Sequence, residues 1–415
     1  MNVISRKIKS LQCTECGSEY ELGPIYGGCT NCRSQGKSGA LEVHYDLDAV
    51  KLSRDWLDGG VRSIWEYRQL LPVEDPNCFL SLGEGNTPLT NDSYYDQQYG
   101  MPHVYLKNEG FNPTWSHKDR LNVVLVSKTK ELKGTGIATS STGNQGISAA
   151  AYAAAAGLPS YVFYPPETAS IYHRLTGMYG GKAVVTPWES RGKLLRKLVE
   201  DHGFTPSYPL VDGELSNPYG IEGYKTVAYE LVRQLGGVPD YILAPVSEGN
   251  ALTGMWKGFN ELLQLGLTDK LPRLYGCQAA GADALVQSLH QGDEKVKVLD
   301  EAYSLATSTR ERTAGVHVLR SIRASGGGAF AVSDRQIQDT MIALGKRGYC
   351  VESASAIPVA CLEQLFQEGK VRPEDKIVCL ITSAGLKWPD LIAELAPPPL
   401  RIEGNWESFS RETGL

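Results

Sequence analysis

Short apolar runs alternate with helical segments along the middle of the chain, and this alternation constrains the fold more than any other feature. An apolar run begins at Ser160 and a helical segment follows it to Tyr179; the run KAVVTP comes next, and a second helical segment extends from Glu189 to His202. Strands that are separated by a helix usually run parallel, because a crossover returns the chain to the starting edge. The sequence therefore predicts an α/β fold with a mainly parallel sheet.

The size and charge of the chain limit what it can bind. With 415 residues, of which 42% are hydrophobic, it is long enough for two or three compact units. Its net charge of −6 leaves no basic excess to displace counterions from nucleic acid, so we expect a small-molecule partner. The sequence has no long apolar run, and its start, MNVISRKIKS, lacks the apolar segment of a secretory signal. We therefore expect a soluble, cytoplasmic protein with no membrane contact.

Four cysteines near the N-terminus form two CxxC pairs. Cys13 and Cys16 are followed after twelve residues by Cys29 and Cys32, a spacing that can place four thiolates around one zinc ion. Four protein ligands leave no open coordination position, so the predicted zinc is structural. The alternative is a redox pair, which needs only one CxxC. Zinc ribbons also occur in nucleic-acid binders, but the acidic residues around these cysteines make this one a poor electrostatic match.

Lys118 lies where a lysine can become reactive. It follows the turn Asn112-Pro-Thr-Trp-Ser-His and precedes an apolar run that begins at Leu121, so it stands at the entry to a predicted helix. Loss of water around an ammonium group lowers its pKa, and only the neutral amine can attack an aldehyde to form a Schiff base. The alternative is that Lys118 belongs to an ordinary solvated helix start.

Three polar segments follow predicted strands. In the stretch from Gly136 to Gly146 a short apolar strand ends in a Ser/Thr/Gly/Asn turn that opens an alanine-rich helix, and the N–H groups of this turn suit a carboxylate. The turn from Ser247 to Gly254 suits a phosphate. Thr382 ends an apolar run, at the edge where parallel sheets bind ligands. Each turn has a plainer interpretation, because polar caps and strand–turn–helix units are common in α/β proteins. The segment SLGEGNTPL, which offers Thr87 to a ligand, is a weak signal alone.

Taken together, these segments resemble a known family. The motifs SLGEGNTPL, NPTWSHKDR, SSTGNQG, PVSEGN and TSAGLK occur in the order found in threonine synthases, which are pyridoxal-phosphate enzymes with the tryptophan-synthase-β fold (fold type II). The resemblance implies an α/β protein with two doubly wound sheet domains and an N-terminal zinc ribbon. The implied domains are a ribbon of residues 1–44, a large cofactor-binding domain of 45–125 and 210–400, a small α/β domain of 126–209, and a tail of 401–415.

The resemblance also implies a role for each matching residue. Lys118 would hold pyridoxal 5′-phosphate covalently and act as the catalytic base, Asn144 would bond the phenolic oxygen of the cofactor, and Thr382 would face its pyridine nitrogen. A hydroxyl beside that nitrogen leaves it neutral, which suits elimination and replacement rather than transamination. The remaining predicted contacts are Ser247, Gly249 and Asn250 to the phosphate of the cofactor, and Thr87, Ser141, Thr142 and Gln145 to the amino-acid substrate.

The implied enzyme is a lyase that eliminates or replaces an activated β or γ group of an amino acid, as threonine synthase does with O-phosphohomoserine. The sequence departs from the usual NPTGSFKDRG motif at three positions, Trp115, His117 and Leu121, and Glu248 stands in the phosphate turn. Family members usually carry cations near the positions of Thr168, His173 and Gly220. We therefore expect weak capture of a substrate phosphate, unless other cations have moved in; the candidates are Lys107, Arg174, Lys225 and Arg320.

Three alternative functions remain open. The pair Gln145–Gly146, which stands where the family usually has Thr-Ser, is closer to amino-acid dehydratases and ammonia-lyases. A replacement enzyme of the cysteate-synthase type is also possible, as is a catalytically silent relative that binds other proteins. The presence of Lys118 favours an enzyme over a silent relative. We expect the protein to form a homodimer.

Overall fold

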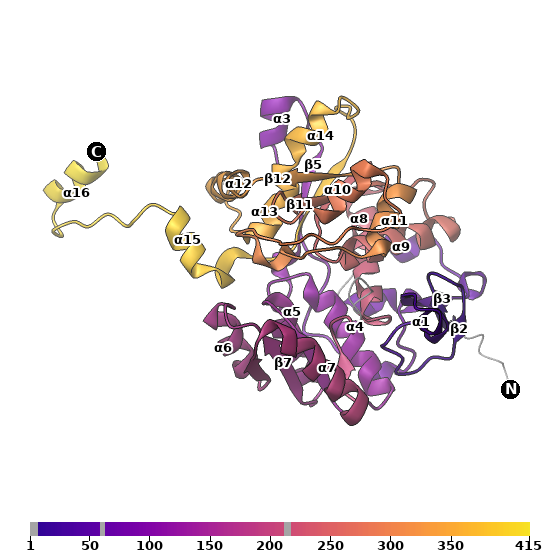
Figure 1. Ribbon diagram of the computed structural model, residues 1–415. Helices are drawn as coiled ribbons and strands as arrows, with labels where there is room; N and C mark the ends of the chain where they lie inside the picture. The colour runs from indigo at the N-terminus through magenta and orange to yellow at the C-terminus, as the bar shows by residue number, and fades with distance from the viewer. Residues whose placement is uncertain (1–6, 59–62, 211–216) are drawn as a thin grey trace.

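Two parallel sheets and a small N-terminal sheet organise the protein, which we describe from a computed structural model covering residues 7–58, 63–210 and 217–415 (Figure 1). The larger sheet has the strand order β12-β11-β10-β13-β5-β4. All neighbouring strands in it run parallel except β4, which pairs antiparallel with β5. The bounds of these strands are β4 Leu89–Asn91, β5 Val104–Asn108, β10 Tyr241–Pro245, β11 Arg273–Ala279, β12 Gly328–Val332 and β13 Ile377–Ile381.

Helices cover both faces of the larger sheet, and the alternation of side chains along its strands explains why. Ile242 and Ala244 of β10 join a core with residues of the helices on one face, whereas Tyr241 and Leu243 join a core on the other. A strand that is buried on both faces must be apolar throughout, as β10 is. The first core includes α8 Lys225–Leu235, α9 Asn250–Gln264, α10 Ala284–Gln291 and α11 Val316–Ala324; the second includes α3 Tyr94–Tyr99, α12 Asp334–Lys346, α13 Ser353–Ala360 and α14 Leu362–Gln367.

The smaller sheet is wholly parallel, with the strand order β8-β7-β6-β9. Val162 and Tyr164 of β7 pack with Tyr172 in one cluster, and Phe163 packs with Leu195 in another on the opposite face. The bounds are β6 Ile137–Ser140, β7 Ser160–Tyr164, β8 Lys182–Val185 and β9 Thr205–Pro206, with α5 Asn144–Ala155, α6 Ser170–Met178 and α7 Trp188–His202. The predicted strand–helix alternation from Ser160 to His202 is therefore present.

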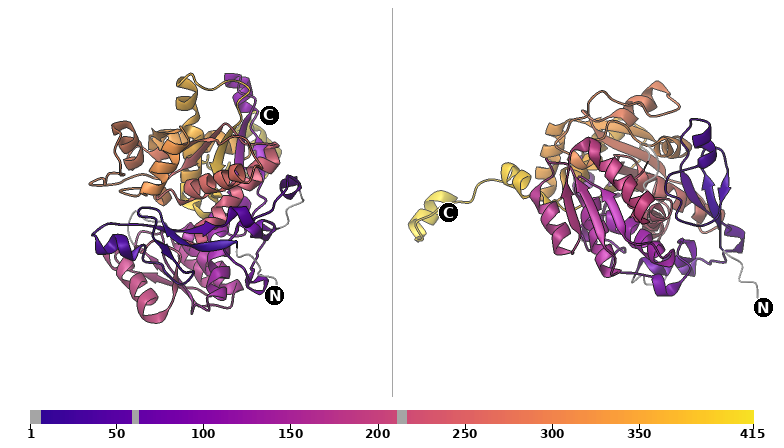
Figure 2. Two further views of the ribbon diagram at one scale, coloured as in Figure 1. Left: turned by 90° about the vertical axis from the view of Figure 1, so that its right-hand side faces the viewer. Right: turned by 60° about the horizontal axis from the view of Figure 1, so that its bottom comes forward.

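The N-terminal sheet has the order β2-β1-β3 and is antiparallel. Its elements are β1 Ile8–Cys13, β2 Glu19–Tyr20, α1 Thr30–Ser34 and β3 Leu41–Tyr45. Polar contacts fasten it to the rest of the protein: the Arg320 guanidinium pairs with Glu15, with an Nη2–Oε2 distance of 2.9 Å, and Tyr219 Oη donates to the Gly23 carbonyl at 2.8 Å. Figure 2 shows this sheet lying against one side of the two larger ones.

The remaining elements bear on the predicted domain borders, which stay a prediction. The helices α2 Asp55–Asp58 and α4 Lys118–Glu131 and the 3₁₀ segment Ile64–Leu70 lie between the N-terminal sheet and β6 along the chain. The strands of the two larger sheets fall within the residue ranges predicted for the two domains.

At the C-terminus, α15 Pro389–Leu395 is followed by α16 Trp406–Thr413, which projects away from the body (Figure 1). Among the described residues, no helix is long and apolar enough to cross a bilayer.

Candidate active site

A cavity brings together segments that lie far apart in the sequence. Its walls are the start of α4, the turn between β6 and α5, the turn between β10 and α9, and the residues that follow β13 and precede α13. The strand ends that contribute to it are carboxyl ends of parallel strands, where α/β sheets bind ligands. The predicted site residues that line it are Lys118, Ser141, Thr142, Asn144, Gln145, Ser247, Gly249, Asn250 and Thr382.

Lys118 is the first residue of α4, and the turn before it is tightly fixed. The buried Asp119 carboxylate accepts hydrogen bonds from the Thr114 N–H at 2.7 Å and from the Ser148 hydroxyl at 2.6 Å. Trp115 has φ +60°, a left-handed conformation that is strained for a bulky side chain. The family motif usually has a glycine here, so the chain keeps the backbone path of the turn with a residue that does not favour it.

The Lys118 amine faces the cavity and makes no hydrogen bond or ion pair with any residue that the structure describes. Burial lowers its pKa, and the nearby carboxylates of Glu248 and Glu352 only partly oppose this. A lower pKa increases the fraction of neutral amine near neutral pH. Burial lowers the pKa of Lys107 and Lys387 as well, but the other buried lysines differ from Lys118 in having polar partners. Lys107, Lys128 and Lys225 form ion pairs with glutamates, and Lys387 donates to backbone carbonyls.

The turn between β6 and α5 is built by its own polar groups. The Ser141 hydroxyl oxygen accepts from the N–H groups of Gly143 at 3.0 Å and Gly146 at 2.9 Å, so it shapes the turn as well as lining the cavity. The Asn144 amide donates to Glu352 Oε2 at 2.9 Å. The Gln145 amide donates to the Ser207 carbonyl at 2.7 Å. Asn144 is thus held in place by a carboxylate that also lines the cavity.

The turn between β10 and α9 presents a helix N-terminus to the cavity. Gly249 has φ +91°, and a Cβ there would lie 2.3 Å from Val318 Cβ, so no other residue fits without rearrangement. Glu248 is held by the Asn250 amide, with an Nδ2–Oε2 distance of 3.0 Å. Burial and the neighbouring Glu311 raise the pKa of Glu248 to about 7. A carboxyl that is partly protonated at neutral pH repels an anion less than a full carboxylate does.

The third wall joins Thr382 to the start of α4. The His117 N–H and the His117 Nδ1 both donate to the Thr382 carbonyl, at 2.9 and 3.2 Å. Burial and the adjacent Lys118 lower the pKa of His117 well below its usual value, so the imidazole is neutral. The hydroxyls of Thr382 and Ser355 lie 3.0 Å apart. Since Ser355 is held by α13, the Thr382 side chain has a fixed orientation.

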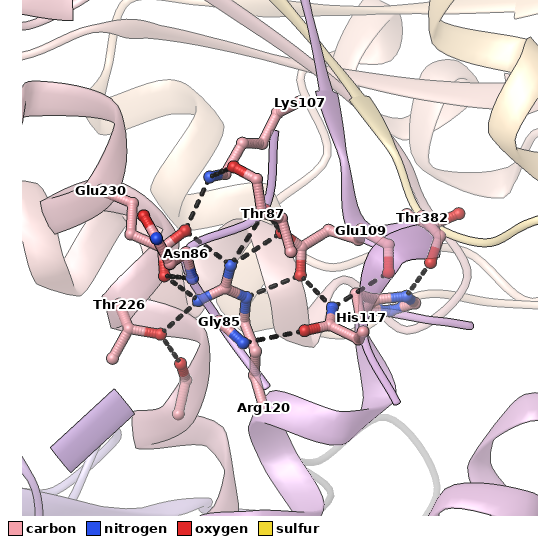
Figure 3. Close-up of polar contacts among 12 residues, drawn as sticks. Gly85, Asn86, Thr87, Lys107, Glu109, His117, Arg120, Thr226, Glu230 and Thr382 are labelled. Atoms are coloured by element: carbon pink, nitrogen blue, oxygen red, sulfur yellow. Dashed lines mark hydrogen bonds and ion pairs between the residues drawn. The ribbon is translucent and has the colours of Figure 1, made fainter. Parts of the chain in front are cut away.

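Thr87 is the one predicted substrate residue that does not line this cavity. Its hydroxyl donates to Glu109 Oε1 at 2.7 Å and accepts from Arg120 at 3.2 Å (Figure 3). Arg120 bridges Glu109 and Glu230, and Lys107 pairs with Glu230 at 2.6 Å; these four charged side chains are completely buried. We call Lys107, Glu109, Arg120 and Glu230 the ion network. The substrate role of Thr87 stays a prediction.

The sequence did not identify two carboxylates that line the cavity. Glu352 precedes α13 and contacts Asn144 and Ser308, the latter at 3.0 Å, and Glu311 follows a 3₁₀ turn at Thr307–Thr309. An acid next to a helix start was the available signal for Glu352, but such acids are common on surfaces. Among the described residues that line the cavity, Lys118 is the single lysine or arginine, whereas glutamates Glu248, Glu311 and Glu352 all contribute.

The cations that could bind a substrate phosphate lie elsewhere. Lys107 and Lys225 are bound to buried glutamates, Arg320 pairs with Glu15, and Arg174 is exposed on α6. Gly220 packs against α4, and a Cβ there would lie 3.1 Å from Leu121 Cγ. An adjoining hollow that shares Tyr208, Glu248 and Glu311 with the cavity does carry arginines: Arg191, which is 8% exposed, Arg310 and Arg312.

The four N-terminal cysteines converge on one point. One sulfur from each of Cys13, Cys16, Cys29 and Cys32 lies within 4.8 Å of the others, and three of the residues are buried. Gly39 packs against this cluster, since a Cβ there would lie 2.7 Å from Cys13 Sγ. The cluster can hold a metal ion.

Comparison with known proteins agrees with the geometry of the cavity. The family model described as pyridoxal-phosphate dependent enzyme matches residues 80–383. The chain belongs to the pyridoxal-phosphate-dependent enzymes. Within this family it is 33% identical over 409 residues to a threonine synthase of Methanocaldococcus jannaschii, covering 96% of this chain and 98% of the relative. It is 35% identical over 330 residues to one of Mycobacterium tuberculosis, covering 78% and 88%.

Solved structures support the fold of this pyridoxal-phosphate enzyme. Maize serine racemase superposes with a TM-score of 0.64 at 22% identity, over 75% of this chain and 92% of that one. Threonine deaminase isoform 2 of Solanum lycopersicum superposes with a TM-score of 0.63 at 20% identity, over 75% and 88%. The predicted fold class, fold type II with an additional N-terminal ribbon, is confirmed.

Proposed function

We propose that the enzyme uses pyridoxal 5′-phosphate, bound at Lys118, to eliminate or replace a side-chain group of a small amino acid, in the manner of threonine synthases. The observation that carries the proposal is the Lys118 amine, which faces the cavity with a lowered pKa. The four other buried lysines that the structure describes, Lys107, Lys128, Lys225 and Lys387, each have a polar partner. The cofactor, when bound, supplies an electron sink for the Cα of the amino acid.

The residues of the cavity fit that cofactor. Lys118 would hold it and move the proton at Cα, and the Thr382 hydroxyl would donate a hydrogen bond to the ring nitrogen without protonating it. The N-terminus of α9, after Gly249, would bind its phosphate, and the turn from Ser141 to Gln145 would bind the substrate carboxylate. Glu248 is the exception in this set; its raised pKa supports the view that the turn tolerates a phosphate nearby.

The test is to purify the protein with the cofactor, record its visible spectrum, and fix the cofactor with borohydride. The fixed group should map to Lys118. The loaded enzyme is then offered O-phosphohomoserine, O-phosphoserine, threonine and diaminopropionate, and spectral changes and products are recorded. A protein that binds no cofactor, or that fixes it to another lysine, would contradict the proposal. Cofactor binding without turnover of any amino acid would favour the silent relative.

We expect threonine formation from O-phosphohomoserine to be weak. Each lost charge-assisted contact to a phosphate costs about 1.5–3 kcal/mol, and Gly220, Thr168 and His173 supply no cation where the family usually has one. Turnover typical of biosynthetic enzymes, with a low KM, would show that this expectation is wrong. In that case Arg191→Met, which changes a cation of the adjoining hollow, should raise the KM for this substrate.

For the N-terminal cluster we propose a structural zinc ion held by Cys13, Cys16, Cys29 and Cys32. The support is the convergence of the four sulfurs and the paired CxxC spacing. Metal analysis of protein purified under reducing conditions should give one zinc per chain, and Cys29→Ala should lose it. Loss of the metal should unfold the ribbon.

A further inference from the structure

An apolar groove lies between α12 and α15, on the outside of the larger sheet domain. Its lining includes Met341 and Ile342 of α12, Tyr349 and Cys350 after that helix, and Ile392 and Leu395 of α15. Ile342 is 37% exposed. The groove adjoins the active site, because Val351 lines it and the next residue, Glu352, lines the Lys118 cavity. A contiguous apolar hollow of this kind usually marks a contact surface.

The chain carries a segment with matching properties. Beyond Pro397, several of its large apolar side chains are exposed, Leu400 by 62%, Ile402 by 44% and Trp406 by 69%, and Phe409 is half-buried. Trp406 and Phe409 lie one turn apart on α16, with ring centroids at 5.4 Å, and form one apolar face. The Asn405 side chain caps the helix by accepting from the Ser408 N–H. Eight residues are too few for a stable helix in water, so α16 needs a surface to pack on.

Figures 1 and 2 show that the tail leaves α15 and carries α16 away from the body. The cause is the run Pro397-Pro398-Pro399, since consecutive prolines form a stiff, extended segment. Because α15 itself forms one wall of the groove, the tail would have to reverse direction after these prolines to reach the groove of its own chain. A second copy of the chain can be reached without such a reversal.

We propose that α16 of a second copy fills the groove between α12 and α15, with Trp406 as its anchor, and that the two copies exchange tails around a two-fold axis. Such an exchange uses the same surface twice and closes the assembly as a dimer. Lys346 lines the groove. The tail carries Glu403, Glu407 and Glu412 against Arg401 and Arg411, so it brings a small net negative charge to that lysine. The docked helix would also brace the residues that precede Glu352. The inference does not depend on the proposed function.

The first experiment measures the mass of the full-length protein in solution by sedimentation. We expect a dimer for the wild type, a monomer for the chain ending at Pro399, and at least a tenfold weaker dimer for Trp406→Ala. The control is Met178→Ala, which removes an 82% exposed side chain from α6 and should leave the dimer intact. A wild-type monomer, or a dimer that survives truncation, would overturn the proposal.

A second experiment distinguishes exchange from back-folding. Ser410→Cys places a thiol on α16 next to the apolar face, and Cys350 supplies an exposed thiol in the groove. Mild oxidation with oxidised glutathione should give a covalent dimer on a non-reducing gel, and adding Cys350→Ser should abolish it. A disulfide within one chain would show that the tail occupies its own groove and would overturn the exchange.

Discussion

Lys118 and Arg120 are two residues apart on α4, yet they belong to opposite kinds of charged environment. Two residues correspond to about 200° around a helix, so the two side chains point to opposite sides. Arg120 is completely buried between Glu109 and Glu230, with four N–O distances of 2.6–2.8 Å (Figure 3). Lys118 faces two glutamates across a cavity without an ion pair to the residues described. A buried charge that is fully paired supports the fold, and one left unpaired is available for chemistry.

The largest effect should come from Lys118→Ala. Because a positioned proton-transfer group contributes about 10²–10⁴-fold and this residue also holds the cofactor, turnover should fall by at least about 10³-fold. The covalent cofactor signal should vanish while the fold is retained. Steady-state kinetics and visible absorbance measure both, and Lys182→Ala, at an exposed lysine, serves as the control. Retained turnover would show that the unpaired position of Lys118, in contrast to that of Arg120, is not used for chemistry.

Arg120→Met should act on stability instead. Removing one partner of a buried ion pair leaves uncompensated charges and typically costs about 3–5 kcal/mol. We expect a loss of this size in the free energy of unfolding, measured with urea. Arg335→Met breaks an exposed pair with Asp339 and should change stability little. Equal effects of the two variants would show that the ion network has no special structural role.

The lowered pKa of Lys118 predicts a pH dependence for the cofactor-free protein. Between the folded-state pKa and the ordinary lysine pKa of 10.5, the unfolded chain binds more protons at this lysine than the folded one does. The contribution of Lys118 to stability therefore rises with pH across that window and is unfavourable below it. Lys118→Met should remove the rise and stabilise the cofactor-free protein at neutral pH. Unfolding measured at several pH values tests this; an unchanged pH profile would contradict it.

Glu248→Gln should give the smallest effect on stability. The contribution of Glu248 to stability changes with pH in the opposite direction to that of Lys118. Burial and Glu311 raise the pKa of Glu248 from 4.5 to about 7, so the folded state binds more protons between these values and the contribution to stability falls as pH rises. The variant should lose this fall and be slightly more stable near pH 7. It also removes a carboxylate that opposes the lowering of the Lys118 pKa. A stability profile identical to that of the wild type between pH 4.5 and 7 would contradict this assignment.

The sequence predicted those parts of the site whose local structure is determined by a single short segment. Lys118 starts a helix, and the turn before α9 and Thr382 follow the apolar strands β10 and β13, whose parallel pairing brings their ends to one edge of the larger sheet. The turn before α5 likewise follows an apolar strand, β6, at the carboxyl end of the smaller sheet. The sequence missed Glu352 and Glu311 because their position in the cavity wall depends on packing between segments that are far apart in the chain. Thr87 shows the opposite case. The sequence predicted that its hydroxyl is available to a ligand, but in the structure this hydroxyl bonds Glu109 and Arg120 of the ion network.

The contact between Gly220 and Leu121 has a consequence for any attempt to place a cation at position 220. An arginine at position 220 would enter space that Leu121 and Leu125 now occupy, within 3.1–3.2 Å of the new Cβ. An arginine introduced at this position alone would crowd these leucines before it could improve phosphate binding. A shortened Leu121 alone would leave a void in the core. A variant designed to carry a cation here therefore has to change both positions together.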